Sequence, residues 1–191
     1  AGFAGSMHYM ARHGMKRARP AALVPGTVSV ITARMEYLPR ALGEGWQAIE
    51  WQRIGDAHAA TVSLYARGRD YHKVLRTRLQ ALADRIAAEV GPFGHRVFTD
   101  SAPVLEVELA QRSGIGWRGK HTLALHREGG SMFFLGEIYV DLPLPITEPV
   151  PPLAQATQVR VLPAGGNIRT LTTVDPQATP LRASTIEFDV T

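Results

Sequence analysis

Cysteine is absent from the 191-residue sequence. This excludes disulfide bonds, thiolate metal ligands and an iron–sulfur cluster held by the chain itself. No apolar run approaches the roughly 20 residues that a membrane-spanning helix needs, so we expect no membrane association. The first residues show no charged segment followed by an apolar stretch, so we expect no signal peptide. A cytoplasmic location fits the missing cysteines. Because the sequence does not begin with methionine, we expect a fragment of a longer protein.

Basic residues are concentrated in the first half of the chain. Residues 1–100 hold 14 Lys and Arg against 8 Asp and Glu, whereas residues 101–191 hold 7 against 9. One basic cluster spans residues 12–19 and another spans residues 67–78. A charge run is usually a solvated helix face, but two clusters in one half favour a polyanionic partner.

The chain is expected to mix strands and helices. Alternating β-branched residues predict a strand at 27–35, and prolines and glycines predict a long surface loop at 39–60. An apolar stripe predicts a helix at 70–90, with Asp70 as N-cap and Gly91 at its end. The other expected elements are a short helix at 7–18 and strands at 96–99, 122–125 and 132–140, the last two joined by a glycine turn.

Composition changes at residues 148–152, which read Glu-Pro-Val-Pro-Pro. We expect residues 1–147 to form one α/β (α+β) domain with residues 148–152 as a linker. Residues 153–191 are rich in Thr, Ala, Pro and Gly with short alternating apolar pieces, which predicts a degenerate β-like tail.

Asp100 follows a short apolar run and precedes a helix-start signal. Ser101 is expected to cap that helix, with Pro103 in its first turn and Gly114 at its end. On local pattern alone Asp100 is equally a turn residue or a general acid whose pKa is raised by desolvation.

The nearby loop 114–122 contains three glycines with Trp117, Arg118, Lys120 and His121, and glycine lets a large flat group approach the backbone. Its letters match a dinucleotide fingerprint, but the loop follows a helix rather than a strand, so the required context fails. The seven histidines show no metal-ligand spacing, and single core or surface histidines are the expected account.

Segment 65–73, Tyr-Ala-Arg-Gly-Arg-Asp-Tyr-His-Lys, lies at the entrance of the predicted helix. Aromatic rings among cations suit nucleobases or another planar ring, and a helix N-terminus favours anions. The alternative is an ordinary capped helix with a basic start, and the density of aromatic and charged residues favours function.

Taken together, the motifs resemble the epoxyqueuosine reductase family of bacterial tRNA queuosine synthesis. The matching segments occur in the family's order: residues 10–14 (MARHG), 17–20 (RARP), 23–27 (LVPGT), 65–73 (YARGRDYHK), 98–106 (FTDSAPVLE), 114–122 (GIGWRGKHT), 133–138 (FFLGEI) and 141–145 (DLPLP). They cover roughly residues 1–148, and the combination is far more specific than any one segment.

The resemblance implies a nitroreductase-like, cobalamin-binding domain in a monomeric enzyme that reduces epoxyqueuosine in tRNA to queuosine. Asp100 would be the proton donor. The residues implied to contact cobalamin are Arg12, Ser63, Asp100, Lys120, His121, Ala124 and Leu135. The residues expected to face tRNA phosphates are Lys16, Arg17, Arg19, Arg67, Arg69 and Lys73.

The chain also departs from the family pattern. Leu64 stands where the family usually has arginine, and the chain starts inside the pattern, without its first helix and strand. The family carries two [4Fe–4S] clusters, but residues 153–159 stand where the first cysteine motif is expected, and every cysteine ligand is absent. Two alternatives therefore remain: an inactive fragment that binds cobalamin or tRNA, and a flavin-dependent reductase on a related scaffold.

Overall fold

The computed structural model describes residues 5–8, 12–38, 45–100 and 102–147, together with the strands at 168–174 and 183–186. Within this part of the chain, no helix is long and apolar enough to cross a membrane. The fold is mixed α/β, as the sequence predicts, while the nitroreductase-like relationship stays a prediction.

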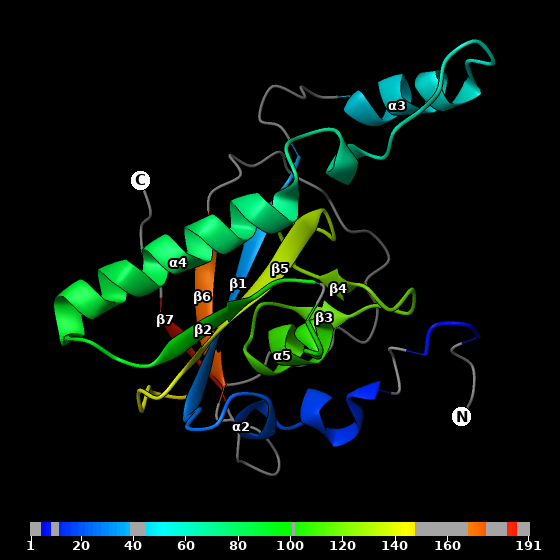
Figure 1. Cartoon of the computed structure of the whole chain (residues 1–191). Coiled ribbons are helices and arrows are strands. Elements are labelled where there is room, and N and C mark those ends of the chain that lie inside the picture. Colours follow the sequence, from blue (N-terminus) through cyan, green and yellow to red (C-terminus); the bar gives the residue numbers. More distant parts are fainter. Residues whose placement is uncertain are drawn as a thin grey trace.

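A five-stranded antiparallel sheet organises the molecule, with the order β2-β5-β1-β6-β7 (Figure 1). Its central strands β1 (Ser29–Glu36) and β5 (Phe133–Val140) pair along their whole length, from Ser29 with Val140 to Glu36 with Phe133. Strand β2 (His95–Phe98) pairs antiparallel with the C-terminal half of β5, from Glu137 to Val140. The strands predicted at 27–35, 96–99 and 132–140 are confirmed within two residues at each end.

Helix α4 (Tyr71–Val90) covers one face of the sheet. Its buried Leu75, Leu79 and Leu82 pack against the alternate residues of β1 and β5 that point to this face, such as Ile31 and Ile138. Asp70 caps the helix by accepting a hydrogen bond from the His72 backbone N–H, and Gly91 ends it at a φ of 91°. The predicted helix and both of its caps are confirmed.

The opposite face of the sheet is covered by helix α5 (Glu106–Arg112) and by the two-stranded ribbon of β3 (Trp117–Arg118) and β4 (Ala124–Leu125). Leu109 of α5 packs with Val30 and Tyr139 of the sheet, and Ala110 packs with Phe133. Because strand residues alternate between faces, neighbouring residues of β5 serve two separate cores.

The loop predicted over 39–60 is wrong in part, because helix α3 (Trp46–Gly55) lies inside it. Trp46 is buried at its start, and the Glu50 carboxylate lies within 2.8 Å of Arg53 Nη1 and 2.5 Å of Arg67 Nη2. The partner Arg67 lies near the 3₁₀ turn η2 (Leu64–Ala66), outside the helix, so the helical pattern alone does not reveal it. In Figure 1, α3 lies beyond the sheet, on the side where α4 begins.

Two further expectations about helices differ from the structure in part. Of the helix expected at 7–18, residues 9–11 lie outside the described residues, Arg12 is helical, and the 3₁₀ turn η1 (Gly14–Arg17) and the short helix α2 (Pro20–Leu23) follow. Helix α5 begins at Glu106, and no side chain caps it. Pro103 therefore lies before the helix and not in its first turn. Ser101 lies outside the described residues. Gly114 follows its end at a φ of 75°, as expected.

The glycine turn does not join paired strands. Strand β4 pairs with β3 instead of β5, and the turn is closed by a bridge between His126 and Gly130. Sequence spacing predicted both strands but could not assign their partners, because strand pairing depends on contacts distant in sequence.

The tail contributes strands to the sheet. Strand β6 (Ile168–Val174) pairs antiparallel with β1, and β7 (Ala183–Ile186) pairs with β6. The predicted linker at 148–152 lies outside the described residues, and the division into domain, linker and tail stays a prediction.

Candidate functional site

A cavity of about 180 Å³ lies where the start of α4, the end of β2, the start of α5 and the first residues of β5 meet. One side of it is acidic and the other is apolar and aromatic. Its walls are formed by Tyr71, Asp100, Glu106, Val107, Leu123, Ala124, Ser131, Phe133, Phe134 and Leu135. Segments far apart in the sequence therefore build a single concave site.

Asp100 lies two residues beyond β2 in a constrained conformation. Its φ of 46° is in the left-handed region, where aspartate is tolerated better than most other residues. Its backbone N–H donates to the carboxylate of Glu106. Its Oδ2 accepts a hydrogen bond from the Tyr71 hydroxyl and lies 3.2 Å from His72 Nε2. The backbone and the carboxyl of Asp100 are thus both held in place, although the side chain is 55% exposed.

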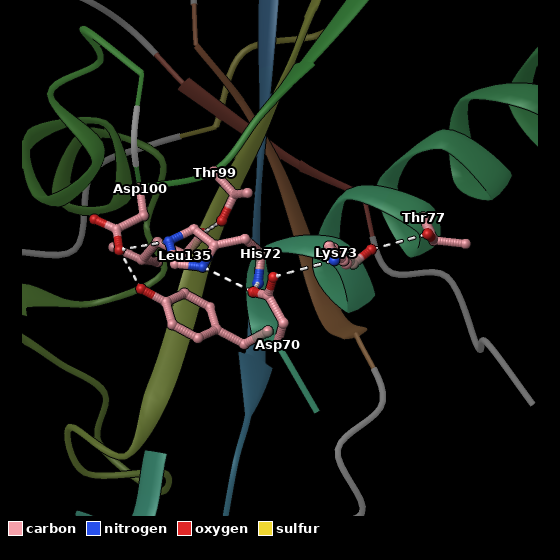
Figure 2. A network of polar contacts seen from close by, with 8 residues as sticks. Asp70, His72, Lys73, Thr77, Thr99, Asp100 and Leu135 are labelled. Carbon is pink, nitrogen blue, oxygen red and sulfur yellow. Dashed lines mark hydrogen bonds and ion pairs between the residues drawn. The ribbon is translucent and has the colours of Figure 1, made fainter. Parts of the chain in front are cut away.

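His72 connects Asp100 to Asp70, as Figure 2 shows. Its Nδ1 lies 3.0 Å from Asp70 Oδ1, on the ring edge away from Asp100. Both contacts are hydrogen bonds only when the ring carries two N–H protons or when one carboxyl is protonated. The His72 hydrogen bond lowers the pKa of Asp70. The arrangement can therefore hold a proton that is shared among three groups.

Tyr71 is placed by packing as well as by hydrogen bonding. Its ring stacks on Phe134 of β5, with centroids 4.0 Å apart and planes 1° from parallel, and Tyr65 contacts it edge-on at 6.2 Å. Burial, followed by the hydrogen bond to Asp100, raises the pKa of the Tyr71 hydroxyl. Tyr71 therefore remains a hydrogen-bond donor to Asp100 across the physiological pH range.

Glu106 is the second carboxyl of the cavity. It is the first residue of α5, and burial, followed by the charge of Asp100, raises its pKa to about 7. A raised pKa in a carboxyl that lines a cleft is typical of functional acids.

Glu137 lies fully buried on the same face of β5 as Leu135. Neither of its carboxyl oxygens has a hydrogen-bond partner within the described structure, and the same holds for the Oγ1 of Thr32, its cross-strand neighbour. Burial, followed by the charge of Glu106, raises the pKa of Glu137 well above its ordinary value. Burial without a partner therefore favours the protonated, uncharged form of Glu137 beneath the site.

A buried ion pair supports the turn beside the cavity. Arg34 Nη1 lies 2.5 Å from Glu36 Oε1, and both side chains are less than 10% exposed. A Cβ atom on Gly129 would lie 2.6 Å from Arg34 Nη1, so a side chain at this position would displace the ion-paired guanidinium. His126 Nδ1 accepts hydrogen bonds from the backbone N–H groups of Glu128 and Gly129, at 3.2 and 3.1 Å. The turn thus leads in a fixed geometry to Ser131 and Phe133 in the cavity wall.

The residues predicted to contact cobalamin are only partly brought together. Asp100, Ala124 and Leu135 line the cavity. Arg12, Ser63, Lys120 and His121 are outside its lining, and their role stays a prediction.

Two glycines of the 114–122 loop, Gly116 and Gly119, lie close to other residues of the protein, and the approach of a large flat group to this loop stays a prediction. A Cβ on Gly116 would collide with the Leu125 carbonyl, and one on Gly119 would lie 2.6 Å from the His121 ring. Gly116 is therefore required by the neighbouring backbone of β4, whereas a side chain at position 119 would have to displace the exposed His121 ring. The glycines predicted that another group lies close to the backbone here. In the structure the neighbouring groups are other residues of the protein.

The two basic clusters lie at opposite ends of β1. Lys16, Arg17 and Arg19 precede the Ser29 end, whereas α4 begins beside Phe134, which pairs with Met35 near the other end. Arg67 is tied to Glu50 through two nitrogens and donates through Nε to the Val62 carbonyl at 2.7 Å. Arg69 and Lys73 line another cavity of about 350 Å³ along α4, together with Arg78. Their contact with RNA stays a prediction.

Sequence reasoning missed three residues of the site: Tyr71, His72 and Glu106. The first two belong to segment 65–73, whose aromatic and charged density marked it for function, and Glu106 ends the segment 98–106. Histidine spacing gave no signal for His72, because its partner Asp100 is 28 residues away. Within the described residues no group of three or more His, Asp or Glu could hold a metal ion.

Fold and site together define an antiparallel α/β domain with an acid-lined cavity, and comparison with known proteins assigns its family. The sequence model described as "Epoxyqueuosine reductase QueG, DUF1730" matches residues 17–101. The epoxyqueuosine reductase of Alicycliphilus denitrificans is 75% identical over 149 residues, which are 78% of this chain and 41% of that protein. Over the part that these matches cover, the chain belongs to the epoxyqueuosine reductase family.

Solved structures agree on the fold. A crystal structure of selenomethionine-labelled epoxyqueuosine reductase superposes with a TM-score of 0.60 at 23% identity, covering 75% of this chain and 37% of that one. An epoxyqueuosine reductase with an epoxyqueuosine-modified tRNA-Tyr stem loop superposes with a TM-score of 0.53 at 22% identity, covering 70% and 34%. The chain thus spans about two-fifths of the length of these relatives.

Proposed function

We propose that this chain forms the acid-bearing, cobalamin-binding part of an epoxyqueuosine reductase, which converts the epoxide of epoxyqueuosine in tRNA to the alkene of queuosine. The high identity to proteins of that name supports the reaction. The observation that carries the proposal is the cavity in which Tyr71 and His72 hold the carboxyl of Asp100.

The proposed reaction balances with two electrons and two protons. Both carbon–oxygen bonds of the epoxide break, a carbon–carbon π bond forms, and the oxygen leaves as water. Asp100 donates the first proton to the epoxide oxygen as general acid. Tyr71 and His72 keep the carboxyl aimed at the cavity, while Phe133, Phe134 and Leu135 exclude water from that side.

The apolar wall fits one face of a flat macrocycle. Ala124 and Leu135 lie in this wall, and the exposed Leu123 beside them extends its apolar surface. When bound, reduced cobalamin would supply the electrons. Ala124 and Leu135 would hold it, with Arg12, Ser63, Lys120 and His121 as the further candidates.

Iron–sulfur clusters do not fit this chain. It has no cysteine, and no thiolate is available to hold iron. The proposed reaction therefore takes its electrons from a source outside these 191 residues, such as a chemical reductant.

The experiment combines the full chain with cobalamin, titanium(III) citrate and an epoxyqueuosine-modified tRNA stem loop, and nucleoside mass spectrometry measures queuosine. Asp100→Asn is the sharpest variant, because asparagine tolerates the left-handed backbone and keeps the size of the side chain. We expect cobalamin absorbance changes within about twofold of wild type and a rate about 10²-fold lower or more. Spectral changes without queuosine would indicate a binding module. An unchanged cobalamin spectrum without queuosine would refute the proposal.

A further inference from the structure

We propose that Glu106 is the second proton source of the cavity and supplies the proton with which the former epoxide oxygen leaves as water. This inference rests on the proposed function and concerns a step that Asp100 alone does not complete. Reduction of one epoxide to one alkene consumes two protons, whereas a single carboxyl carries one.

The geometry selects Glu106 among the described acids. Asp100 and Glu106 are the two carboxyl residues in the lining of the cavity. The Glu106 carboxylate also accepts the Asp100 backbone N–H, which anchors it beside the first donor. Asp70 approaches Asp100 only through the His72 ring, and the side chain of Glu108 points to Arg112, 2.5 Å away.

The surroundings of Glu106 favour its protonated form. The carboxyl is withdrawn from water, and it faces Asp100 from the β2–α5 connection and Glu137 from β5. The other titratable groups that act on it, or on which it acts, are His72 and Tyr71 from α4 and Tyr139 from β5. Two contacts act in the opposite direction and lower the pKa of Glu106: the hydrogen bond from the Asp100 backbone N–H and, more weakly, the charge of His72. Burial is the largest influence and outweighs them. The two cavity carboxyls thus have unlike environments, the pattern by which acid and base roles are separated in enzymes.

Glu137, which interacts with Glu106, adds to the difference between the environments of Glu106 and Asp100. It has no described hydrogen-bond partner and is fully buried, so a negative charge on it is strongly disfavoured. A charge on Glu106 and a charge on Glu137 also repel each other. Glu106 lines the cavity and can release its proton there, whereas Glu137 lies outside the lining, where burial favours its uncharged form.

The first test needs neither cofactor nor substrate. Infrared difference spectra of the full chain are recorded between about pH 5 and 9 for wild type, Glu106→Gln and the control Glu108→Gln. Glu108 lies two residues along the same helix and is 42% exposed, so it controls for a lost carboxylate on α5. We expect a protonated carboxyl band that titrates near pH 7 in wild type and in Glu108→Gln, and that is missing in Glu106→Gln.

The second test measures queuosine formation over the same pH range with cobalamin and titanium(III) citrate. We expect the wild-type rate to fall above about pH 7 and Glu106→Gln to be slower by roughly 10²-fold and to lose this pH dependence. Glu108→Gln should follow wild type. A Glu106→Gln variant with the wild-type rate and pH profile would overturn the inference, as would an infrared titration that survives the substitution. No queuosine from wild type would overturn the proposed function and the delivery step with it, whereas loss of the infrared band alone would still place the proton on Glu106.

Discussion

The hydroxyl of Tyr71, at the start of α4, donates a hydrogen bond to the carboxyl of Asp100, which lies 29 residues further along the chain. The ring that carries this hydroxyl is fixed by its stack on Phe134. Strand β5 and the start of α4 thereby fix the position of the Asp100 carboxyl, which follows β2.

Tyr71→Phe removes that hydrogen bond and keeps the stacked ring. We expect the melting temperature to change little and queuosine formation to slow about tenfold, since one hydrogen bond to a charged group contributes about 1.5–3 kcal/mol. Single-turnover assays measure the rate. Tyr65→Phe, on the neighbouring ring, is the control and should keep the wild-type rate. A Tyr71→Phe rate equal to wild type would show that the hydroxyl does not position Asp100.

Gly136→Ala tests the contact between α4 and β5. The new Cβ would lie 2.7 Å from Leu79 Cδ1 and 3.1 Å from the Phe98 carbonyl oxygen. We expect a loss of about 1–3 kcal/mol in the free energy of unfolding, measured by urea titration. Leu79→Ala alone should cost about 2–5 kcal/mol, and the double variant less than the sum, because the smaller side chain makes room. Gly68→Ala, where a Cβ meets nothing within 4 Å, is the control. Additive losses would contradict this packing account.

His126 makes stability depend on pH. Burial, followed by the charge of Arg34, lowers its pKa from 6.5 to about 4. Between pH 6.5 and about 4, His126 binds a proton in the unfolded chain but not in the folded chain. The contribution of neutral His126 to the free energy of unfolding is therefore complete above pH 6.5 and is lost as the pH falls toward 4. His126→Asn retains an acceptor but cannot titrate, so it should flatten the urea-unfolding free energy across this range. An equally steep pH dependence in the variant would assign the effect to another group.

The ion pair between Glu50 and Arg67 is expected to hold α3 against the 3₁₀ turn η2. Hydrogen bonding to Arg67 lowers the pKa of Glu50, so the pair contributes above the ordinary carboxyl pKa of 4.5 and is lost as the pH falls further. At pH 7, Glu50→Gln should speed amide hydrogen exchange in residues 46–66 and leave α4 protected. Glu89→Gln, an exposed change on α4, should have no effect on residues 46–66. Uniform loss of protection would mean that α3 is not a separate unit.

Arg69 and Lys73 are expected to contribute to RNA binding through charge. The double substitution Arg69→Ala and Lys73→Ala should reduce the slope of log affinity against log salt by roughly 1.5, as expected for two lost phosphate contacts. Filter binding with the stem loop at several salt concentrations measures this slope. Arg85→Ala, on the exposed side of α4, should leave it unchanged. An unaltered slope in the double variant would remove this surface from the proposed RNA contact.

Much of the fold follows from local patterns. The apolar stripe and caps of α4 and the alternation of β1 and β5 appear directly in the sequence, because helix and strand periods are properties of neighbouring residues. Helix α3 was missed because the ion pair of Glu50 with Arg67 spans 17 residues. The separate partners of β4 and β5 were missed for the same reason.

The sequence by itself determined the family, the absence of cysteine-held iron and the importance of segments 65–73 and 98–106, because these depend on residue identity and order. Only the tertiary structure decided that Tyr71, His72 and Glu106 surround Asp100, and that Glu137 is buried beneath them with no hydrogen-bond partner among the described residues. Hydrogen bonds and desolvation act over a few ångströms in space, whatever the separation along the chain, so these contacts exist only once the sheet and its two helical faces have formed.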